Sequence, residues 1–575
     1  MSKQFKGIGV GDGVGIGKVF LLQDPEFNYK EESTDQSKEW DYFLSCQQEV
    51  ISQIEGLIKI ATEKISPEKG EIFQAHLEIA KDEQIHEEIK KLINEGKSAA
   101  WSVNEVFNKY QMIFEGMEDD YFKERASDIK DLKRRFLACV CQVKLPDLLL
   151  IQEESIIIAH DLSPSETAML NKKYIKGFAT NIGGATSHSA IMAKTLEIPA
   201  IVSLKNITNS VKEGEIIAID AREGIVETDL SPEEINNWEQ KREDAEESKK
   251  ELEKFKTGEC IMKDGTKIPL RGNIGQPKDL KKVIEYGGKG VGLFRSEFLY
   301  MESQDWPTEE EQYQAYSEVL EKNQGEPITI RTLDIGGDKH LNYFTFPKEM
   351  NPFLGYRALR LSLDKREIFK TQLRALLRAS EKGKLKIMFP MVATVDEFTK
   401  AKAITKEVEE ELIKEGKSVS KDYQIGMMVE IPSTAVISKA FAKEADFFSV
   451  GSNDLIQYTH AADRMSEEVN YLYQPNNPSI LTLIKYTVEG ARKYSREVSV
   501  CGEMASNPIS AIILVGLGIN SLSMSATAIP SIKRVLSQLN LEECRDIAME
   551  CIDFSTEEEV LNYVKGYLAQ QNIRY

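Results

Sequence analysis

The feature that most restricts the fold of this 575-residue sequence is a run of short apolar segments in its C-terminal half. From residue 260 onward, these segments alternate with longer stretches of helical hydrophobic periodicity. The predicted strands cover residues 268–273, 290–294, 328–333, 385–391, 425–431, 447–451, 498–502 and 521–524. Eight strand–helix units are the number that forms a (β/α)8 TIM-type barrel. A doubly wound sheet is the alternative, because a sequence does not show whether a sheet closes.

Polar side chains fall at or near the C-terminal ends of the predicted strands. They are Arg295, Arg331, Glu430, Asn453, Asp454 and Cys501. In a barrel these strand ends form one face, which is where barrel enzymes place their chemistry. Each residue alone has an ordinary structural explanation, but six such placements together favour a site.

The chemistry of this set is coherent. Two carboxylates, Glu430 and Asp454, suit Mg²⁺, which prefers a few protein oxygens and several waters. Four arginines offer planar donor groups that match phosphate and carboxylate, namely Arg295, Arg331, Arg357 and Arg464. The set therefore predicts a site for a small, strongly anionic substrate and a magnesium ion.

A second candidate site lies at Gly183-Gly184-Ala185-Thr186-Ser187-His188, which precedes a stretch of helical periodicity. The pattern places His188 in the first turn of a helix, where free backbone N–H groups and the helix dipole attract phosphate. A lone histidine is more often a core or capping residue. Here the glycine pair and the two hydroxyl groups favour a histidine that accepts a phosphoryl group.

The N-terminal half combines a helical segment with an α/β pattern. Four antiparallel helices are expected between residues 33 and 143. The predicted strands around them are 18–22, 155–159, 173–180, 200–202 and 215–219. The glycine-rich opening, residues 7–17, does not meet the G-x-G-x-x-G spacing and is predicted to be a turn before the first strand.

These patterns predict a multidomain α/β protein. The expected parts are an α/β domain at 1–32 and 144–230, an inserted four-helix bundle at 33–143, a charged helical linker at 231–259 and the barrel at 260–575. The linker would allow the first half to move relative to the second.

Charge and cysteine content limit the classes of partner and compartment. A net charge of −20 argues against nucleic acid and anionic membrane surfaces as partners, since both are polyanions. No apolar run approaches the ~20 residues needed to cross a bilayer, so we expect no membrane insertion. Seven scattered cysteines without C-x-x-C pairs indicate a reduced, cytoplasmic protein.

The His188 stretch resembles the phosphohistidine signature of the phosphoenolpyruvate-utilising enzymes, and most closely the Enzyme I family of the bacterial phosphotransferase system. The motifs at 292–297, 331–339, 451–455 and 501–503 are similar to the phosphoenolpyruvate site of the same family. The resemblance extends over nearly the whole chain in the family's order. One departure is Ala185, where the family usually has an arginine.

The resemblance implies a mechanism and a role for each matching residue. Phosphoenolpyruvate would bind on the barrel face with Mg²⁺ held by Glu430 and Asp454, and His188 would take the phosphoryl group. Cys501 would protonate the enolate that leaves. The substrate-binding residues would be Arg295, Arg331, Arg357, Asn453, Asp454 and Arg464.

Further roles implied by the resemblance concern the first half of the chain and the assembly. Thr167 would hydrogen-bond His188, although residues 163–166 also read as a helix-capping box. The acceptor would be the phosphocarrier protein HPr, docked on the helices near His76 and Arg125. The family also implies a homodimer through the barrel.

Two alternatives stay open at this point. A non-catalytic regulatory homologue that binds phosphoenolpyruvate would keep the same fold. His460 could serve as proton donor in place of Cys501, although a surface histidine explains it equally well. The remaining histidines, His86, His160 and His340, are expected to be structural or surface residues.

Overall fold

The structure is a computed structural model of the full chain. It describes all residues except 1, 12, 24, 26, 65–66, 117–119, 144, 147, 149–150, 163–165, 168–169, 185–189, 191–192, 194–195, 197, 324, 338, 340 and 465. Inside helices, the side chains at 60–72, 75, 120–125, 127 and 467 are also outside the description. The chain divides into two compact units, Met1–Ser248 and Lys249–Tyr575.

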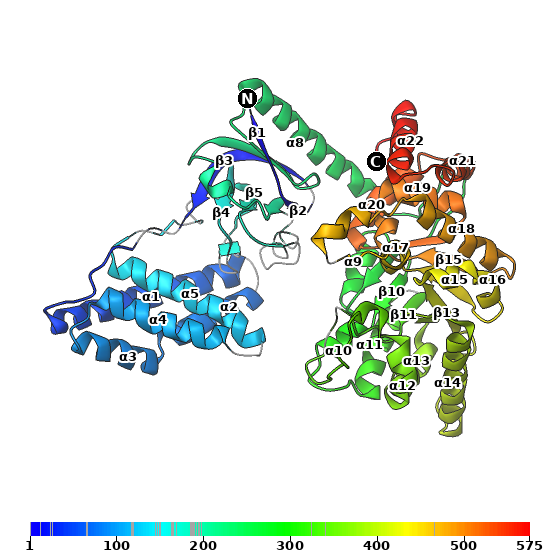
Figure 1. Ribbon diagram of the computed structural model, residues 1–575, viewed down its shortest axis with the longest axis horizontal. Helices are drawn as coiled ribbons and strands as arrows, with labels where there is room; N and C mark the ends of the chain where they lie inside the picture. Colours follow the sequence, from blue (N-terminus) through cyan, green and yellow to red (C-terminus); the bar gives the residue numbers. More distant parts are fainter. Residues whose placement is uncertain are drawn as a thin grey trace. The chain divides into compact units, whose positions relative to one another are not determined.

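The second unit is built on a closed barrel of parallel strands (Figure 1). In chain order the strands are β9 (Leu270–Ile274), β10 (Val291–Arg295), β11 (Ile328–Arg331), β12 (Leu385–Phe389), β13 (Gln424–Val429), β14 (Phe447–Val450), β15 (Glu497–Val500) and β16 (Ser521–Met524). The last strand pairs with the first, with Leu522 opposite Leu270 and Met524 opposite Gly272. The barrel prediction is therefore confirmed, and the doubly wound alternative is wrong.

Helices surround this barrel. They are α9 (Asp279–Glu285), α10 (Glu297–Met301), α11 (Glu309–Lys322), α12 (Leu359–Asp364), α13 (Arg366–Ala379), α14 (Val395–Lys414), α15 (Pro432–Val436), α16 (Ser438–Phe441), α17 (Ser452–His460), α18 (Pro478–Arg492), α19 (Pro508–Leu517), α20 (Ile529–Leu536), α21 (Leu541–Cys551) and α22 (Glu557–Gln570). The outward side chains of the strands pack with these helices in one large apolar core. Burial of this apolar surface is the main stabilising contribution to the unit.

The interior of the barrel holds a separate apolar cluster. It consists of Leu293, Met388, Met428, Phe447 and Cys501. Because side chains alternate between the two faces of a strand, the inward positions form layers, and the polar layer at the C-terminal strand ends lies next to this cluster.

The first unit contains a mixed sheet in the order β1-β8-β7-β3-β4-β5-β6-β2. Its strands are β1 (Lys3–Lys6), β2 (Ile8–Val10), β3 (Val14–Leu22), β4 (Ser155–Ala159), β5 (Ile175–Thr180), β6 (Ala200–Val202), β7 (Ile216–Asp220) and β8 (Ile225–Thr228). The N-terminal strand β3 pairs with β4 and β7, so both ends of the unit's sequence build one sheet, as expected.

The prediction that residues 7–17 form a turn was wrong, because most of this segment is strand. Gly9 lies in β2, and Gly15 and Gly17 share one face of β3. At Gly15 an added Cβ would lie 2.3 Å from the carbonyl oxygen of Lys176, so the alternating glycines permit close approach of neighbouring backbone.

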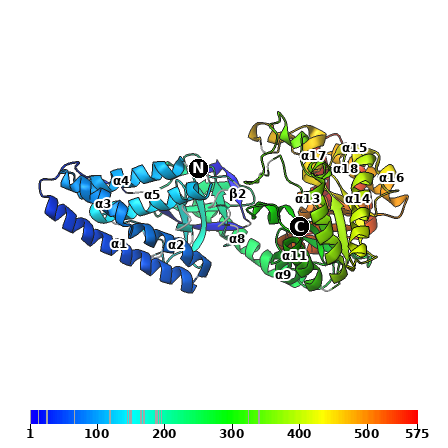
Figure 2. The same ribbon diagram turned by 90° about the horizontal axis from the view of Figure 1, so that it is seen from below.

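The helical part of the first unit has one more helix than expected. Within the described residues between 36 and 140 it contains α1 (Gln36–Lys64), α2 (Pro67–Ala80), α3 (Glu83–Asn94), α4 (Ala99–Glu115) and α5 (Asp120–Val140), which lie side by side (Figures 1 and 2). The missed helix is α3. Its signals are the N-cap Asp82, which accepts from the N–H groups of Gln84 and Ile85, and buried isoleucines at 85, 89 and 93.

The helix α8 (Pro232–Leu252) follows the sheet, and none of its residues is buried. Trp238 donates its indole N–H to Glu227 at 2.6 Å, which fastens the first part of the helix to β8.

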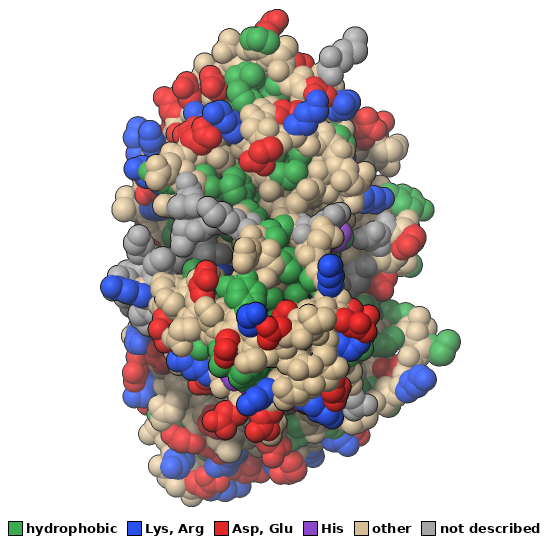
Figure 3. Space-filling model, turned by 90° about the vertical axis from the view of Figure 1, so that its left-hand side faces the viewer, with side chains coloured by type: hydrophobic (Ala, Val, Ile, Leu, Met, Phe, Trp, Pro, Cys, Tyr) green, Lys and Arg blue, Asp and Glu red, His purple; other side chains and the backbone are tan. Residues whose placement is uncertain are grey.

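On the face drawn in Figure 3, acidic and basic side chains are interspersed, with hydrophobic side chains between them. Among the described residues, no helix combines the length and apolar character needed to cross a membrane.

Candidate active site

The residues predicted at the strand ends do gather on one end of the barrel. Arg331 is the last residue of β11, Glu430 follows β13, and Cys501 follows β15. Their exposed fractions are 6%, 1% and 3%. Asp454 lies in the first turn of α17, and the charges of Arg331 and Asp454 both act on the Glu430 carboxyl group. Strand geometry therefore explains why residues far apart in the sequence form one site.

A buried ion network orients two of the arginines. Arg331 contacts both Glu297 at 2.5 Å and Asp334 at 2.9 Å through the same Nη2 atom. Lys339 contacts the same two carboxylates at 2.8 and 3.1 Å. The other oxygen of Asp334 accepts from Arg357 Nη2 at 2.9 Å. These cations hold the pKa values of Glu297 and Asp334 below their usual range despite burial.

Sequence reasoning did not assign roles to Glu297, Asp334 and Lys339, although all three lie in the quoted motifs. The available signal was spacing, since Asp334 stands three residues after Arg331 and a buried arginine needs a carboxylate nearby. Glu297 stands two residues after Arg295, which is exposed, and its contact with Arg331 appears only in the tertiary structure.

Arg357 and a further arginine, Arg464, lie near Asp454. The Oδ1 atom of Asp454 is 3.7 Å from Arg357 Nη1, and its Oδ2 atom is 3.5 Å from Arg464 Nη1. Arg357 also donates to the hydroxyl group of Tyr458 at 3.3 Å. Arg295, by contrast, is an exposed residue at the end of β10. The site thus combines guanidinium groups fixed by carboxylates with one that is accessible to solvent.

Glu430 and Asp454 fit a divalent cation. Burial and the neighbouring charges of Asp454 and Asp334 raise the pKa of Glu430 to about 8. Asp454 Oδ1 is buried and makes no hydrogen bond among the described residues. Two carboxylates that repel each other in a buried position are stabilised when a cation binds between them.

The backbone of Met391 holds one oxygen of Glu430. Its N–H donates to Glu430 Oε1 at 2.5 Å, and Met391 has a φ of 52°, in the left-handed region that is rare for a residue with a side chain. Such strained backbone is concentrated at functional sites, where surrounding structure maintains it.

Cys501 is suited to hold a proton. Burial raises the pKa of its thiol, while Arg331 and Arg295 oppose this shift. The thiol is therefore protonated at neutral pH, as a proton donor requires. His460 is a poor alternative, since its two ring nitrogens contact Leu472 O at 2.7 Å and Ser479 Oγ at 3.0 Å.

Asn453 lies in the turn that begins α17. Its Oδ1 atom accepts from the backbone N–H of Glu503 at 3.0 Å, so the turn after β14 is joined to the turn after β15. This contact links the segment that carries Asp454 to the segment that carries Cys501.

His188 lies outside the described residues, as do Ala185, Thr186 and Ser187. On either side, Gly183 has a φ of 112°, and Ala190 is helical and fully buried. Thr167, which the family resemblance pairs with His188, is also fully buried. The adjacent Glu166 forms an ion pair with Arg134 of α5 at 2.5 Å. The Thr167–His188 hydrogen bond stays a prediction.

The two residues predicted to contact a partner differ in what the structure describes. His76 is 1% exposed, and its Nε2 atom lies 3.0 Å from Asp128 Oδ1. In this position it joins α2 to α5, and its contact with a partner stays a prediction. The side chain of Arg125 lies outside the described part of the chain.

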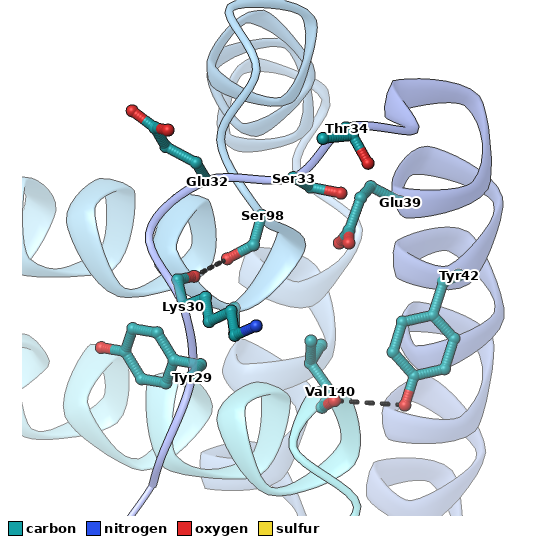
Figure 4. Close-up of a pocket in the computed structure, with 10 residues that line it drawn as sticks. Tyr29, Lys30, Glu32, Ser33, Thr34, Glu39, Tyr42, Ser98 and Val140 are labelled. Carbon is teal, nitrogen blue, oxygen red and sulfur yellow. Dashed lines mark hydrogen bonds between the residues drawn. The ribbon is translucent and has the colours of Figure 1, made fainter.

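A polar pocket of about 450 Å³ lies among the helices of the first unit (Figure 4). Ser98 Oγ donates to the carbonyl oxygen of Lys30 at 2.5 Å, Glu39 accepts from the N–H of Ala99 at 2.7 Å, and Tyr42 donates to the carbonyl oxygen of Val140 at 3.1 Å. These groups attach the segment before α1, and α1 itself, to α4 and α5. The pocket does not share the chemistry of the barrel site.

We predict that Asp334→Asn destabilises the barrel and weakens binding of anionic substrate. Loss of the carboxylate leaves Arg331, Lys339 and Arg357 with less counter-charge, and breaking a buried ion pair costs about 3–5 kcal/mol. Urea unfolding and calorimetric titration with phosphoenolpyruvate measure the two effects. The matched control is Asp422→Asn, because Asp422 is exposed, and we expect it to change the free energy of unfolding and the substrate affinity little. Equal unfolding free energies and equal affinities in the two variants would contradict the role given to Asp334.

Comparison with known proteins gives matches over both units. Residues 249–541 match the PEP-binding domain of the PEP-utilising enzymes, residues 151–224 their mobile domain and residues 6–125 their N-terminal domain. The phosphoenolpyruvate-protein phosphotransferase of Staphylococcus aureus strain Mu50 is 48% identical over 571 residues, which are 99% of this chain and 100% of that protein.

Two other relatives carry the same name. The protein of Staphylococcus carnosus is 48% identical over 99% of both chains, and that of Priestia megaterium is 47% identical over 98% of this chain and 99% of its own. Together, the domain matches and these full-length relatives show that the chain belongs to the family of phosphoenolpyruvate-utilising enzymes.

Proposed function

We propose that this chain is a phosphoenolpyruvate-protein phosphotransferase that passes a phosphoryl group through His188 to a phosphocarrier protein of the HPr type. The observation that carries this proposal is the convergence of Arg331, Arg357, Glu430, Asp454 and Cys501 on one end of the barrel. The relatives that match the chain over its full length bear the name of this activity. This phosphoryl transfer would be the first step of sugar uptake by the bacterial phosphotransferase system.

The barrel site would bind the substrate by its charges. Arg295, Arg331 and Arg464 would neutralise the phosphate and carboxylate oxygens, and Asn453 would hold the carboxylate group. Arg357 is fixed by Asp334 and faces Asp454, so it would stabilise the arrangement at the same end of the site. Planar guanidinium groups suit both anionic groups of this substrate.

Glu430 and Asp454 would hold Mg²⁺. When bound, the ion neutralises substrate charge and favours phosphoryl transfer. The residues of the chain perform the remaining steps. The neutral imidazole of His188 attacks phosphorus, the bond from phosphorus to the enol oxygen breaks, and the electron pair leaves on the enolate.

Cys501 would then complete the formation of pyruvate. The enolate takes a proton at its methylene carbon from the thiol, and solvent later reprotonates the thiolate. Phosphorylated His188 would next transfer its phosphoryl group to a histidine of HPr docked on the helices of the first unit. Because one histidine serves both reactions, the cycle would require movement between the two halves of the chain.

The alternative of a non-catalytic regulatory homologue has no support from the relatives, which are named as phosphotransferases. Cys501, Glu430 and His188, whose replacement would favour such a homologue, are all present in the sequence.

We expect His188→Ala to abolish phosphorylation while leaving substrate binding intact, because the barrel site does not include this residue. The protein is incubated with Mg²⁺ and phosphorus-labelled phosphoenolpyruvate, and the label is located by mass spectrometry under alkaline conditions. His160→Ala is the matched control, since His160 is an exposed histidine of the same unit. Label on the His188→Ala protein, or none on the native one, would refute the role of His188.

Glu430→Gln should weaken the binding of divalent cations, because it removes one of the two carboxylate ligands. Mn²⁺ can replace Mg²⁺ as a paramagnetic probe, and its binding is measured by electron paramagnetic resonance without any turnover. The control is Glu410→Gln, which changes an exposed glutamate of α14. Unchanged Mn²⁺ affinity in Glu430→Gln would exclude this carboxylate as a ligand.

We also propose a cytoplasmic homodimer formed through the barrel. An apolar patch of Val436, Ile437 and Tyr486 supports this assembly, with Val436 61% exposed. Ser438 Oγ donates to the carbonyl oxygen of Tyr486 at 2.8 Å, so the two segments of the patch are adjacent.

The seven cysteines are free thiols, which supports the proposed location in a reduced compartment, the cytoplasm.

Val436→Lys is therefore expected to shift the protein from dimer to monomer, because it places a charge in the apolar interface. Sedimentation velocity over a range of concentrations measures the shift. Ile413→Lys serves as control, since Ile413 is a similarly exposed apolar residue on α14. An unchanged dimer dissociation constant in Val436→Lys would place the interface elsewhere.

A further inference from the structure

We propose that Asn273 is a positioning residue that holds the backbone of Cys501 and so aims its thiol at the enolate. The proposal rests on the proposed function, in which Cys501 is the proton donor. Asn273 lies on β9, the first strand of the barrel, and Cys501 follows β15, the seventh. The two residues are 228 positions apart in the sequence and meet only because the barrel closes.

The contact is a hydrogen bond from the side chain of Asn273 to the main chain of Cys501. Asn273 Nδ2 donates to the carbonyl oxygen of Cys501 at 2.9 Å. The backbone N–H of Cys501 donates to Val450 O at 3.0 Å, which continues the pairing of β15 with β14. The peptide groups on both sides of the Cys501 α-carbon are thereby fixed, and the direction of its side chain follows from them.

The orientation of the Asn273 amide is determined by chemistry. A backbone carbonyl only accepts hydrogen bonds, so the atom of Asn273 that contacts Cys501 O must be the NH₂ group. The other end, Oδ1, accepts from the hydroxyl group of Ser523 at 2.6 Å. Ser523 thus holds the amide in the orientation in which it can donate to Cys501.

The barrel makes room for this chain of hydrogen bonds. Ser523 lies on β16, which pairs with β9 at the seam where the barrel closes. On β10, a Cβ added to Gly292 would lie 2.4 Å from Ser523 Oγ, so a residue with a side chain would displace the hydroxyl group. The first, second and last strands of the barrel therefore cooperate to place one residue of the seventh.

This arrangement has a specific consequence for the reaction. Protonation of the enolate depends on the position of the Cys501 thiol, whereas transfer from phosphorylated His188 to HPr does not use Cys501 at all. Catalysis is sensitive to small displacements of an acid–base group. Asn273 should therefore affect the exchange between phosphorylated enzyme and pyruvate, and leave the exchange with HPr unchanged.

The experiment uses the full-length protein, phosphorylated on His188 with labelled phosphoenolpyruvate over a long incubation. The phosphorylated protein is freed of substrate and divided into two portions. One portion receives pyruvate and Mg²⁺, and the other receives HPr. Discharge to pyruvate requires the Cys501 thiolate to remove a methyl proton, after which the enolate oxygen attacks phosphorus and the bond to His188 breaks.

We expect Asn273→Ala to slow discharge to pyruvate by about 10- to 100-fold, the usual range for loss of a group that orients a functional residue. The half-saturating pyruvate concentration and the rate of discharge to HPr should stay at native values. Ser523→Ala should slow discharge to pyruvate less, and should add nothing when combined with Asn273→Ala, because both act through one hydrogen-bond chain.

The matched control is Ser521→Ala. Ser521 is a buried serine two residues before Ser523 on the same strand, outside the hydrogen-bond chain to Cys501. It should discharge to pyruvate at the native rate. Thermal unfolding of each variant identifies any general loss of barrel stability.

Discharge of Asn273→Ala to pyruvate at the native rate would overturn the proposal. So would a slowing in Ser521→Ala equal to that in Asn273→Ala, or additive effects of Asn273→Ala and Ser523→Ala. Failure of the native protein to become phosphorylated is a separate result, which would overturn the proposed function itself.

Discussion

The ion network around Arg331 is the interaction on which the barrel site depends. Three cations and two carboxylates share contacts of 2.5 to 3.1 Å, and every side chain among them except Lys339 is nearly buried. Each charge would be costly to bury alone, and each is stabilised by the others. Glu297 and Asp334 thus fix Arg331 and Arg357 in place before any substrate binds, which reduces the reorganisation required for catalysis.

The same end of the barrel contains a second pair of carboxylates, Glu430 and Asp454, of which Asp454 lies 3.7 Å from Arg357 and 3.5 Å from Arg464. Burial, followed by the negative charges of Asp454 and Asp334, raises the pKa of Glu430 to about 8. A site that holds carboxylates beside fixed guanidinium groups can accept a cation and an anion together. This combination distinguishes a site for a metal-bound phosphorylated substrate from a simple anion site.

Much of the fold was predictable because each barrel strand has a strong local signal. All eight predicted segments contain the observed strands to within a residue or two, and the predicted polar residues do lie at their C-terminal ends. Errors arose where the local signal was ambiguous. The glycines of residues 7–17 suggested a turn, but Gly9, Gly15 and Gly17 lie in strands whose neighbours approach too closely for a side chain. The helix α3 was missed because it is short and follows α2 after a break of two residues.

The sequence by itself determined which chemical groups are available and in what order, because motifs and hydrophobic periodicity are local properties. It identified Arg331, Glu430, Asp454 and Cys501 without any knowledge of contacts. Only the tertiary structure decided which of these groups are partners. The pairing of Arg357 with Asp334 and the hydrogen bond from Asn273 to Cys501 join segments that no sequence pattern connects. They exist because closure of the barrel brings all strand ends to one face, and closure is a property of the whole sheet.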